Sequence, residues 1–173
     1  MTERLGRVVY TAEEIAERVR SMGQEITAAY GAEDDLLVLG LLKGSFIFLA
    51  DLVREIRVPL KVDFLVAASY GSGTVSSGDV RLLYDPKAPL LDRAVLVVED
   101  IIDSGKTLAW VLPLLEERGP SRLELCTLLH KRIATLPKEP RWVGFDAPLE
   151  FLVGYGLDYS ENFRHLPYIA SLS

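Results

Sequence analysis

The chain has only one cysteine among its 173 residues, and its lysines and arginines form no basic run. A single cysteine excludes an intrachain disulfide. Its setting, Leu-Glu-Leu-Cys-Thr-Leu-Leu, predicts that Cys126 is a buried, unreactive thiol in a strand. No apolar run reaches the ~20 residues that a membrane span needs, and the first residues lead into no apolar signal segment. We therefore expect a cytoplasmic protein with no membrane partner.

A basic surface is also lacking, because the net charge is -6 and the sequence pI is about 5.0. Proteins that wrap nucleic acid usually carry a basic face or tail, so no nucleic-acid partner is expected. An acidic chain that binds a polyanionic small molecule must gather a few cations locally or recruit a metal ion. The length fits one domain, and no repeat or Pro/Ser-rich linker divides the chain, which predicts a single domain over residues 1–173.

Short apolar runs alternate with helical patterns along the sequence. Thr11 and Glu14 form a capping box ahead of a helix whose apolar positions recur at helical spacing. Further helices are predicted over 46–56 and 106–118, and Trp142 is assigned to the core. Buried or short strands are predicted over 36–42, 61–68, 80–84, 94–98 and 123–129, followed by short strands and turns over 142–173. This order predicts an α/β fold with a mostly parallel sheet.

Polar clusters follow several of these strands, at residues 43–44, 69–79, 99–107 and 130–131. Ligands of open parallel sheets bind beyond the carboxyl ends of the strands, so we expect all four clusters at one edge of the sheet. The segment 69–79 is rich in Gly and Ser and predicts a long loop, which in a compact domain is usually functional or disordered.

The most informative cluster begins with two adjacent acids, Glu99 and Asp100, at the end of an apolar strand. Asp103 follows three residues later, and a Ser-Gly-Lys-Thr turn (104–107) then opens a helix. Backbone N–H groups at a helix start suit a phosphate monoester, and the carboxylates suit a diol and a hydrated Mg²⁺ ion. Burying three acids beside an apolar strand is costly, which favours a functional explanation.

This segment also has two simpler explanations, a helix N-cap and a P-loop. Ser104 is the expected helix N-cap, which accounts for the turn but not for the acids. The Gly105-Lys106-Thr107 triplet matches the end of a nucleotide-binding P-loop, but that motif needs Gly five positions before Gly105, where Asp100 stands. A nucleoside triphosphatase is therefore disfavoured.

Residues 99–107 resemble the signature with which type I phosphoribosyltransferases bind phosphoribosyl pyrophosphate (PRPP). Segments 42–45, 69–71, 129–132 and 151–159 then follow in the order seen in hypoxanthine-guanine phosphoribosyltransferases, so the resemblance covers nearly the whole chain. It implies the type I fold: a mostly parallel, twisted sheet flanked by helices in a core of about 36–140. It also implies a small hood from about 1–10 and 141–173, and a mobile lid at 69–79.

The resemblance implies a role for each matched residue. Asp103 would be the catalytic base that removes the N7 proton of the purine. Lys131 would donate to the purine 6-oxo group, which suits an ammonium because it has donors only. The Lys43–Gly44 loop would contain a non-proline cis peptide that Gly44 makes easier. The implied sites are Glu99, Asp100, Asp103, Ser104, Gly105, Lys106 and Thr107 for ribose and phosphate; Lys43, Gly44 and Arg164 for pyrophosphate; Lys131, Phe151, Leu152 and Asp158 for the purine; Ser69 and Tyr70 in the lid; and Glu99, Asp100 and Asp158 near Mg²⁺.

Taken without the resemblance, several of these residues have ordinary explanations. Lys131 would be a solvated lysine, Phe151 an apolar strand residue, and Asp158 and Arg164 surface charges.

The activity that the resemblance implies is transfer of ribose 5-phosphate from PRPP to N9 of hypoxanthine or guanine, giving IMP or GMP and pyrophosphate. The implied cofactor is Mg²⁺, and the implied assembly is a homodimer or homotetramer. Lys131 disfavours adenine as the base. A xanthine phosphoribosyltransferase stays open, because backbone contacts to the purine 2-position leave no mark in a sequence. A PRPP-sensing regulator of the same fold is the alternative outside the enzymes, and the absence of a basic face counts against an RNA-binding form of it.

Overall fold

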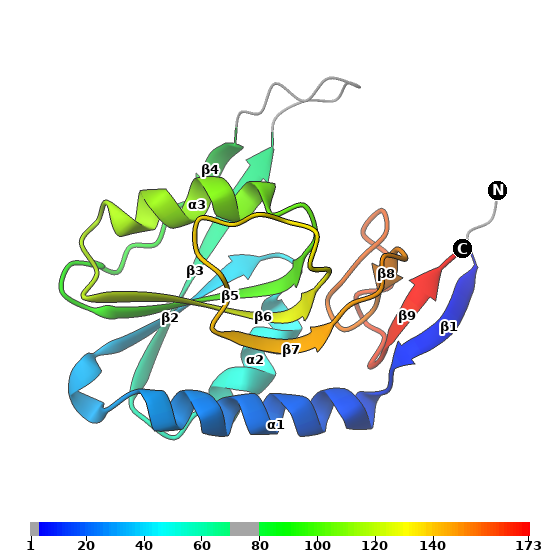
Figure 1. Ribbon diagram of the computed structural model, residues 1–173, viewed down its shortest axis with the longest axis horizontal. Helices are drawn as coiled ribbons and strands as arrows, with labels where there is room; N and C mark the ends of the chain where they lie inside the picture. The colour runs from blue at the N-terminus through cyan, green and yellow to red at the C-terminus, as the bar shows by residue number, and fades with distance from the viewer. Residues whose placement is uncertain (1–3, 70–79) are drawn as a thin grey trace.

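The computed structural model describes residues 4–69 and 80–173 (Figure 1). The predicted lid residues 70–79, Tyr70 among them, lie outside the described residues, and Ser69 is the last residue of its strand. In chain order the elements are β1 (Leu5–Tyr10), α1 (Ala12–Ala29), a 3₁₀ turn (Ala32–Asp34), β2 (Leu36–Leu42), α2 (Phe46–Glu55), β3 (Leu60–Ser69), β4 (Val80–Tyr84), β5 (Ala94–Ile102), α3 (Lys106–Glu116), β6 (Arg122–His130), β7 (Trp142–Asp146), β8 (Leu152–Val153) and β9 (Ile169–Leu172).

The main sheet has six strands in the order β4-β3-β2-β5-β6-β7. Strands β3, β2, β5, β6 and β7 run parallel to their neighbours, and only β4 at the edge is antiparallel. Apolar residues fill β2 and the first half of β5 without alternation, because helices cover both faces of these central strands. The predicted α/β fold with a mostly parallel sheet is confirmed.

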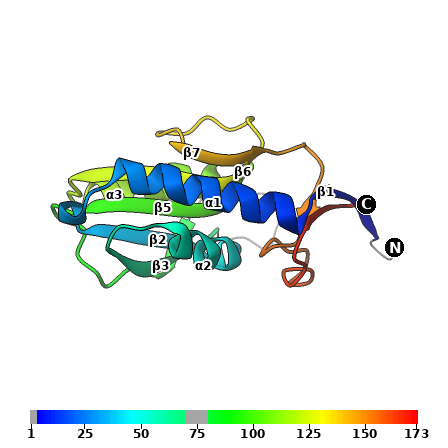
Figure 2. The same ribbon diagram turned by 90° about the horizontal axis from the view of Figure 1, so that it is seen from below.

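Helices cover the two faces unequally (Figures 1 and 2). Helices α1 and α2 lie side by side on one face, and α3 lies on the other. The capping box predicted for α1 is present, since the Thr11 hydroxyl accepts from the Glu14 N–H and the Glu14 carboxylate accepts from the Thr11 N–H. The buried stripe of α1 is the one that the helical spacing predicts: Ile15, Val19, Met22 and Ile26.

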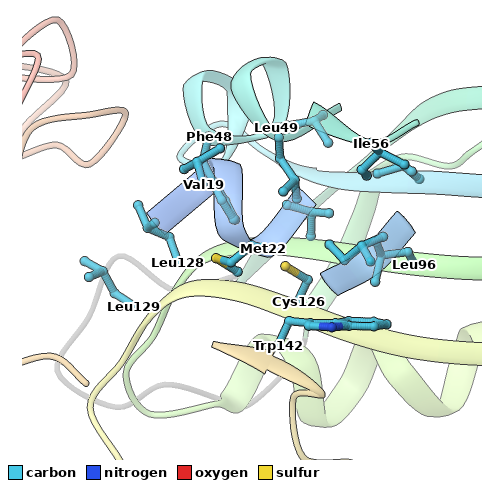
Figure 3. Close-up of a cluster of buried hydrophobic side chains, with 14 of the residues drawn as sticks. Val19, Met22, Phe48, Leu49, Ile56, Leu96, Cys126, Leu128, Leu129 and Trp142 are labelled. Atoms are coloured by element: carbon cyan, nitrogen blue, oxygen red, sulfur yellow. The ribbon is translucent and has the colours of Figure 1, made fainter. Parts of the chain in front are cut away.

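The core under α1 and α2 contains Cys126 and Trp142, the two residues for which the sequence predicted packing alone. In Figure 3, Met22 and Cys126 lie in the same apolar cluster as Trp142. Cys126 is fully buried, and burial raises the pKa of its thiol. Trp142 is 5% exposed, and its ring lies 6.0 Å from that of Tyr30. The predicted burial of the Cys126 thiol and the core position of Trp142 are therefore confirmed.

A smaller antiparallel sheet, in the order β1-β9-β8, joins the two ends of the chain beside the main sheet (Figure 1). Backbone hydrogen bonds between Arg4 and Ser173 close this hood. The hood is smaller than the range 141–173 expected from the sequence, because β7 pairs with β6 and so belongs to the main sheet. The hydroxyl of Tyr155, which follows β8, donates to Asp51 over 2.5 Å and so ties the hood to α2.

In residues 4–69 and 80–173, no helix has both the length and the apolar content needed to cross a membrane.

Candidate active site

The carboxyl ends of β2, β5 and β6 meet at one edge of the main sheet. Lys43, Asp103 and Lys131 are the residues that directly follow these strands. The Lys131 N–H donates to the carbonyl of Ile102 over 3.0 Å, so the ends of β5 and β6 are adjacent. The prediction of a polar edge is confirmed for the clusters at 43–44, 99–107 and 130–131. The cluster at 69–79 begins where β3 ends, and its remaining residues are among those not described.

The two adjacent acids lie inside β5 and do not follow it as expected. The strand continues to Ile102, and it pairs with β6 through Glu99 and Ile101. Ladder hydrogen bonding thus holds Glu99 and Asp100 as half-buried side chains. Burial raises the pKa of the Glu99 carboxyl well above its ordinary value, and the charge of Asp100 adds to this shift. Burial also raises the pKa of Asp100. A cation placed between them would stabilise both carboxylates.

The loop after β2 lies against these acids. The peptide bond between Leu42 and Lys43 is cis, as the resemblance led us to expect for this loop. Gly44 lies one residue beyond this bond, and its part in making the bond easier stays a prediction. A Cβ on Gly44 would lie 1.8 Å from Oδ2 of Asp100, so glycine is required here for close approach. On the other side of the loop, a Cβ on Gly156 would lie 2.3 Å from the Gly44 carbonyl oxygen. The lack of a side chain on Gly156 therefore lets the hood pack against this loop.

The turn from Asp103 to Thr107 lines a small cleft of about 140 Å³, together with Glu99 and Ile101. The sequence predicted Ser104 as the N-cap of α3, but the N-cap is Gly105. Gly105 has φ 72°, where a Cβ would be strained, and no side chain caps the helix. The first N–H groups of α3 are therefore left for a ligand, beside the half-buried Thr107 and the exposed Ser104 and Lys106.

Asp103 and Lys131 form an ion pair across the ends of β5 and β6. The Lys131 ammonium lies 2.9 Å from Oδ2 of Asp103, and the Lys131 side chain is only 7% exposed. This excludes the explanation of Lys131 as a freely solvated lysine. Asp103 is 56% exposed, so the carboxylate remains accessible to a ligand while it holds the lysine.

A second group of charges gathers where the hood meets the loop after β2. Arg164 lies 3.0 Å from Asp158 and donates to the carbonyl of Gly156 over 2.7 Å. Its charge also acts on Asp100 and opposes the rise in that pKa. Lys43 pairs with Glu161 over 3.0 Å, and Glu161 lies 3.3 Å from Arg164. Lys43 and Arg164, predicted from separate segments, are thus linked through Glu161.

The apolar side of the site comes from the hood. Phe151 is 50% exposed, although it precedes the buried Leu152 of β8. Its ring meets that of Tyr159 edge to face, with centroids 5.7 Å apart and planes at 81°. The Phe151 carbonyl accepts from Leu172 of β9, which fixes its backbone. An exposed ring held by a fixed backbone can stack on a planar ligand.

Three residues in these contacts were given no role from the sequence, although two of them lie in the matched segment 151–159. Glu161, Gly156 and Tyr159 lie in a hood segment with no helix or strand period, and their partners are distant in sequence or act through the backbone. The available signals were the family match over 151–159, for Gly156 and Tyr159, and the position of Glu161 three residues before Arg164. Within the described part of the chain, no three His, Cys, Asp or Glu side chains gather closely enough to hold a metal ion by themselves.

This sheet edge offers a helix start to one phosphate and a lysine–arginine pair to a second anion, with carboxylates between. Residues 8–160 match the family model described as phosphoribosyl transferase domain. The chain belongs to this family.

Individual relatives narrow the comparison. The hypoxanthine phosphoribosyltransferase of Salmonella typhimurium is 47% identical over 92% of this chain and 90% of its own. The hypoxanthine-guanine phosphoribosyltransferase of Dictyostelium discoideum is 42% identical over 95% of this chain and 94% of its own. A crystal structure of a hypoxanthine phosphoribosyltransferase from Staphylococcus aureus superposes with a TM-score of 0.92 at 39% identity, covering 98% of this chain and 92% of that one. The expected type I phosphoribosyltransferase fold is confirmed.

Proposed function

We propose that this chain is a purine-salvage enzyme that transfers ribose 5-phosphate from PRPP to N9 of hypoxanthine or guanine, giving IMP or GMP and pyrophosphate. The observation that carries this proposal is the ion pair between Lys131 and Asp103, which lies directly beside the uncapped start of α3. A donor and an acceptor for a 6-oxopurine thus stand next to a site for the phosphate of the sugar. The family membership and the names of the relatives support the same activity.

The 5′-phosphate is assigned to the cleft lined by residues 103–107. Free N–H groups at a helix start and the positive end of the helix dipole favour an anion there. Glu99, which lines the same cleft, and the adjacent Asp100 are assigned to the ribose hydroxyls, since carboxylates accept hydrogen bonds from a diol.

The purine is assigned to the space between Lys131 and Phe151. Lys131 donates to O6 of the base and has no acceptor for the amino group of adenine. Asp103, within reach of the same lysine, accepts the N7 proton. Phe151 stacks on the ring, and the Leu152 backbone and Asp158 lie at its far edge. Contacts to the 2-position decide between hypoxanthine, guanine and xanthine.

The pyrophosphate group is assigned to Lys43, Gly44 and Arg164. Mg²⁺ fits the same region, because Glu99 and Asp100 are adjacent carboxylates whose burial raises their pKa values. Asp158 is connected to this region through Arg164, with which it forms an ion pair and whose charge acts on Asp100. A Mg²⁺ ion usually keeps several waters and binds through one or two carboxylates and the substrate phosphates, so a complete protein cage is not needed. When bound, the ion would neutralise charge on the leaving pyrophosphate.

The reaction is a displacement at C1 of the ribose. The bond from C1 to the pyrophosphate oxygen breaks and takes its electron pair with it, and the bond from C1 to N9 forms. Lys43 and Arg164 stabilise the departing negative charge. Asp103 takes the N7 proton as N9 becomes bonded, and Lys131 keeps the neighbouring O6 in position. The lid assigned to 69–79 belongs to the same proposal and lies largely outside the described residues.

A homodimer or homotetramer in the cytoplasm is also proposed. Support for assembly comes from exposed apolar side chains on β3 and β4, such as Val62 at 42% and Leu83 at 64%. The single, buried cysteine suits a reducing compartment.

A panel of four bases tests the activity. The purified chain is mixed with PRPP, Mg²⁺ and either hypoxanthine, guanine, xanthine or adenine, and nucleotide formation is followed. We expect IMP and GMP to form and AMP not to form. Dominant formation of the xanthine nucleotide would reassign the substrate. PRPP binding without any product would point to a sensor, and neither binding nor product would end the proposal.

A further inference from the structure

One carboxylate links the two cations that the proposed function assigns to pyrophosphate. Oε2 of Glu161 lies 3.0 Å from the Lys43 ammonium, and Oε1 lies 3.3 Å from Nη2 of Arg164. The two oxygens of one side chain thus satisfy cations from two different parts of the chain: the loop after β2 and the hood.

These contacts are of the same chemical kind as those that a diphosphate would make. Lysine and arginine bind carboxylate and phosphate oxygens through the same N–H donors. A pyrophosphate group on these cations and the Glu161 carboxylate would therefore compete for the same donors. If both stayed, like charges would be brought together, which costs energy.

The geometry around Glu161 allows it to leave. The Glu161 side chain is 65% exposed, and the Lys43 side chain is 66% exposed. An exposed ion pair stabilises a protein by only about 0.2–1 kcal/mol. Arg164, by contrast, is 18% exposed and stays anchored by Asp158 and the Gly156 carbonyl. Displacing Glu161 would free Lys43 and one side of Arg164 without releasing the arginine from the hood.

We propose that Glu161 is an internal counter-anion: its carboxylate holds Lys43 and Arg164 in position until the pyrophosphate group of PRPP displaces it. The inference rests on the proposed function. It makes Glu161 a positioning residue that lowers the affinity for PRPP and pyrophosphate and helps the product pyrophosphate to leave.

Two substitutions separate direct competition from a general charge effect. Glu161→Gln keeps the size of the side chain and removes its charge. Glu161→Asp keeps the charge but shortens the side chain by one carbon, so it can no longer span both cations. The matched control is Asp35→Asn, because Asp35 also bridges a lysine and an arginine, at 2.8 Å from both Lys61 and Arg93, beside the amino ends of β2, β3 and β5.

The measurement is calorimetric titration of the full chain with PRPP and with pyrophosphate, each in the presence of Mg²⁺ and without a purine. Loss of an exposed pair of this strength corresponds to roughly 1.4- to 5-fold in affinity for each contact. We expect Glu161→Gln and Glu161→Asp both to bind the two anions about two- to ten-fold more tightly than the unchanged chain. In steady state, KM for PRPP should fall in both variants, whereas Asp35→Asn should leave both quantities unchanged.

A purely structural role for Glu161 gives the opposite result, since loosening Lys43 and Arg164 would weaken binding. Unchanged or weaker binding in Glu161→Gln overturns the inference. Tighter binding in Glu161→Gln but not in Glu161→Asp also overturns it, because a charge effect alone would then suffice. These outcomes are distinct from failure of the proposed function, in which the unchanged chain would make no nucleotide from any purine.

Discussion

The two edges of the main sheet use charged side chains in opposite ways. At the amino ends of the strands, Asp35 binds Lys61 and the buried Arg93, and these cations lower the pKa of its carboxyl. At the carboxyl ends, burial raises the pKa values of Glu99 and Asp100, which have no cation of their own at hydrogen-bond distance among the described ion pairs. At the amino edge Asp35 thus has two cationic partners, whereas Glu99 and Asp100 at the carboxyl edge have none among the described ion pairs and would be satisfied by a ligand or metal ion.

This difference has a consequence for stability as a function of pH. A carboxyl whose pKa is lowered by folding, such as Asp35, stabilises the protein above its ordinary pKa, and this contribution is lost as the pH falls through the lowered value. A carboxyl whose pKa is raised, such as Glu99, has the opposite effect: the folded state is favoured at low pH and loses stability as the pH rises above the ordinary carboxyl pKa. The ionised form of Glu99 that a cation would bind is therefore the form that burial disfavours, whereas ionised Asp35 is the stabilising form.

The largest expected effect lies at the carboxyl edge, in Asp103→Asn. Loss of a general base costs typically 10²- to 10⁴-fold in rate, so turnover of hypoxanthine should fall by about that much. Affinity for PRPP should change little, because the phosphate cleft keeps its backbone N–H groups. Steady-state kinetics and PRPP titration measure both. The control is Asp85→Asn, which removes an exposed acid paired with Arg118. Unchanged turnover in Asp103→Asn would remove the base assignment.

Gly44→Ala should have the next largest effect on activity. The new Cβ would lie 1.8 Å from Oδ2 of Asp100, so the acid or the loop must move. Displacing a group by about 1 Å in an active site can cost on the order of 10²-fold, and we expect a fall of that size in kcat/KM for PRPP. Circular dichroism should show an intact fold. A variant with wild-type kinetics would mean that the contact between Gly44 and Asp100 does not matter for the reaction.

At the amino edge, Arg93→Met should reduce stability and not activity. Arg93 is 8% exposed, and its guanidinium donates to the carbonyls of Asp35 and Pro89 and pairs with the Asp35 carboxylate. Losing hydrogen bonds from a charged group leaves a deficit of about 1–3 kcal/mol in the free energy of unfolding. Urea denaturation measures it, with the exposed Arg20→Met as the control. A kinetic defect at unchanged stability would break the contrast between the edges.

The smallest effect is a gain in stability from Glu99→Gln. This substitution removes a carboxyl whose ionisation burial disfavours, so the variant should unfold at higher urea than the unchanged chain. The gain should be absent near pH 4 and grow toward pH 8, because only the unchanged chain must ionise Glu99. Activity with Mg²⁺ should fall in the same variant. A stability difference that does not depend on pH would argue against charge burial as its cause.

Much of the fold was predictable because the relevant signals are local. Continuous apolar runs such as 36–42 mark strands buried on both faces, and the Thr11–Glu14 capping box marks the start of α1. Element ends were less predictable. Glu99 and Asp100 look like a strand end by polarity, yet pairing with β6 carries β5 on to Ile102. The extent of the hood was misjudged in the same way, since pairing with β6 assigns β7 to the main sheet.

The residues of the candidate site also differ in whether a local sequence signal marks them. Residues 99–107 could be recognised because the acids and the turn adjoin in sequence, while Lys131, Phe151, Asp158 and Arg164 needed the family resemblance. Glu161 could not be found by either route, because its role depends on Lys43, which is 118 positions away.

The sequence by itself determined the α/β class, the covered strands and the acidic turn, because hydrophobic period and turn chemistry act over a few neighbouring residues. Only the tertiary structure decided which charges meet. Ion pairs such as Lys131 with Asp103, and Glu161 with Lys43 and Arg164, join residues from different strands and loops. Coulombic attraction depends on distance in space, and folding, not sequence order, sets that distance.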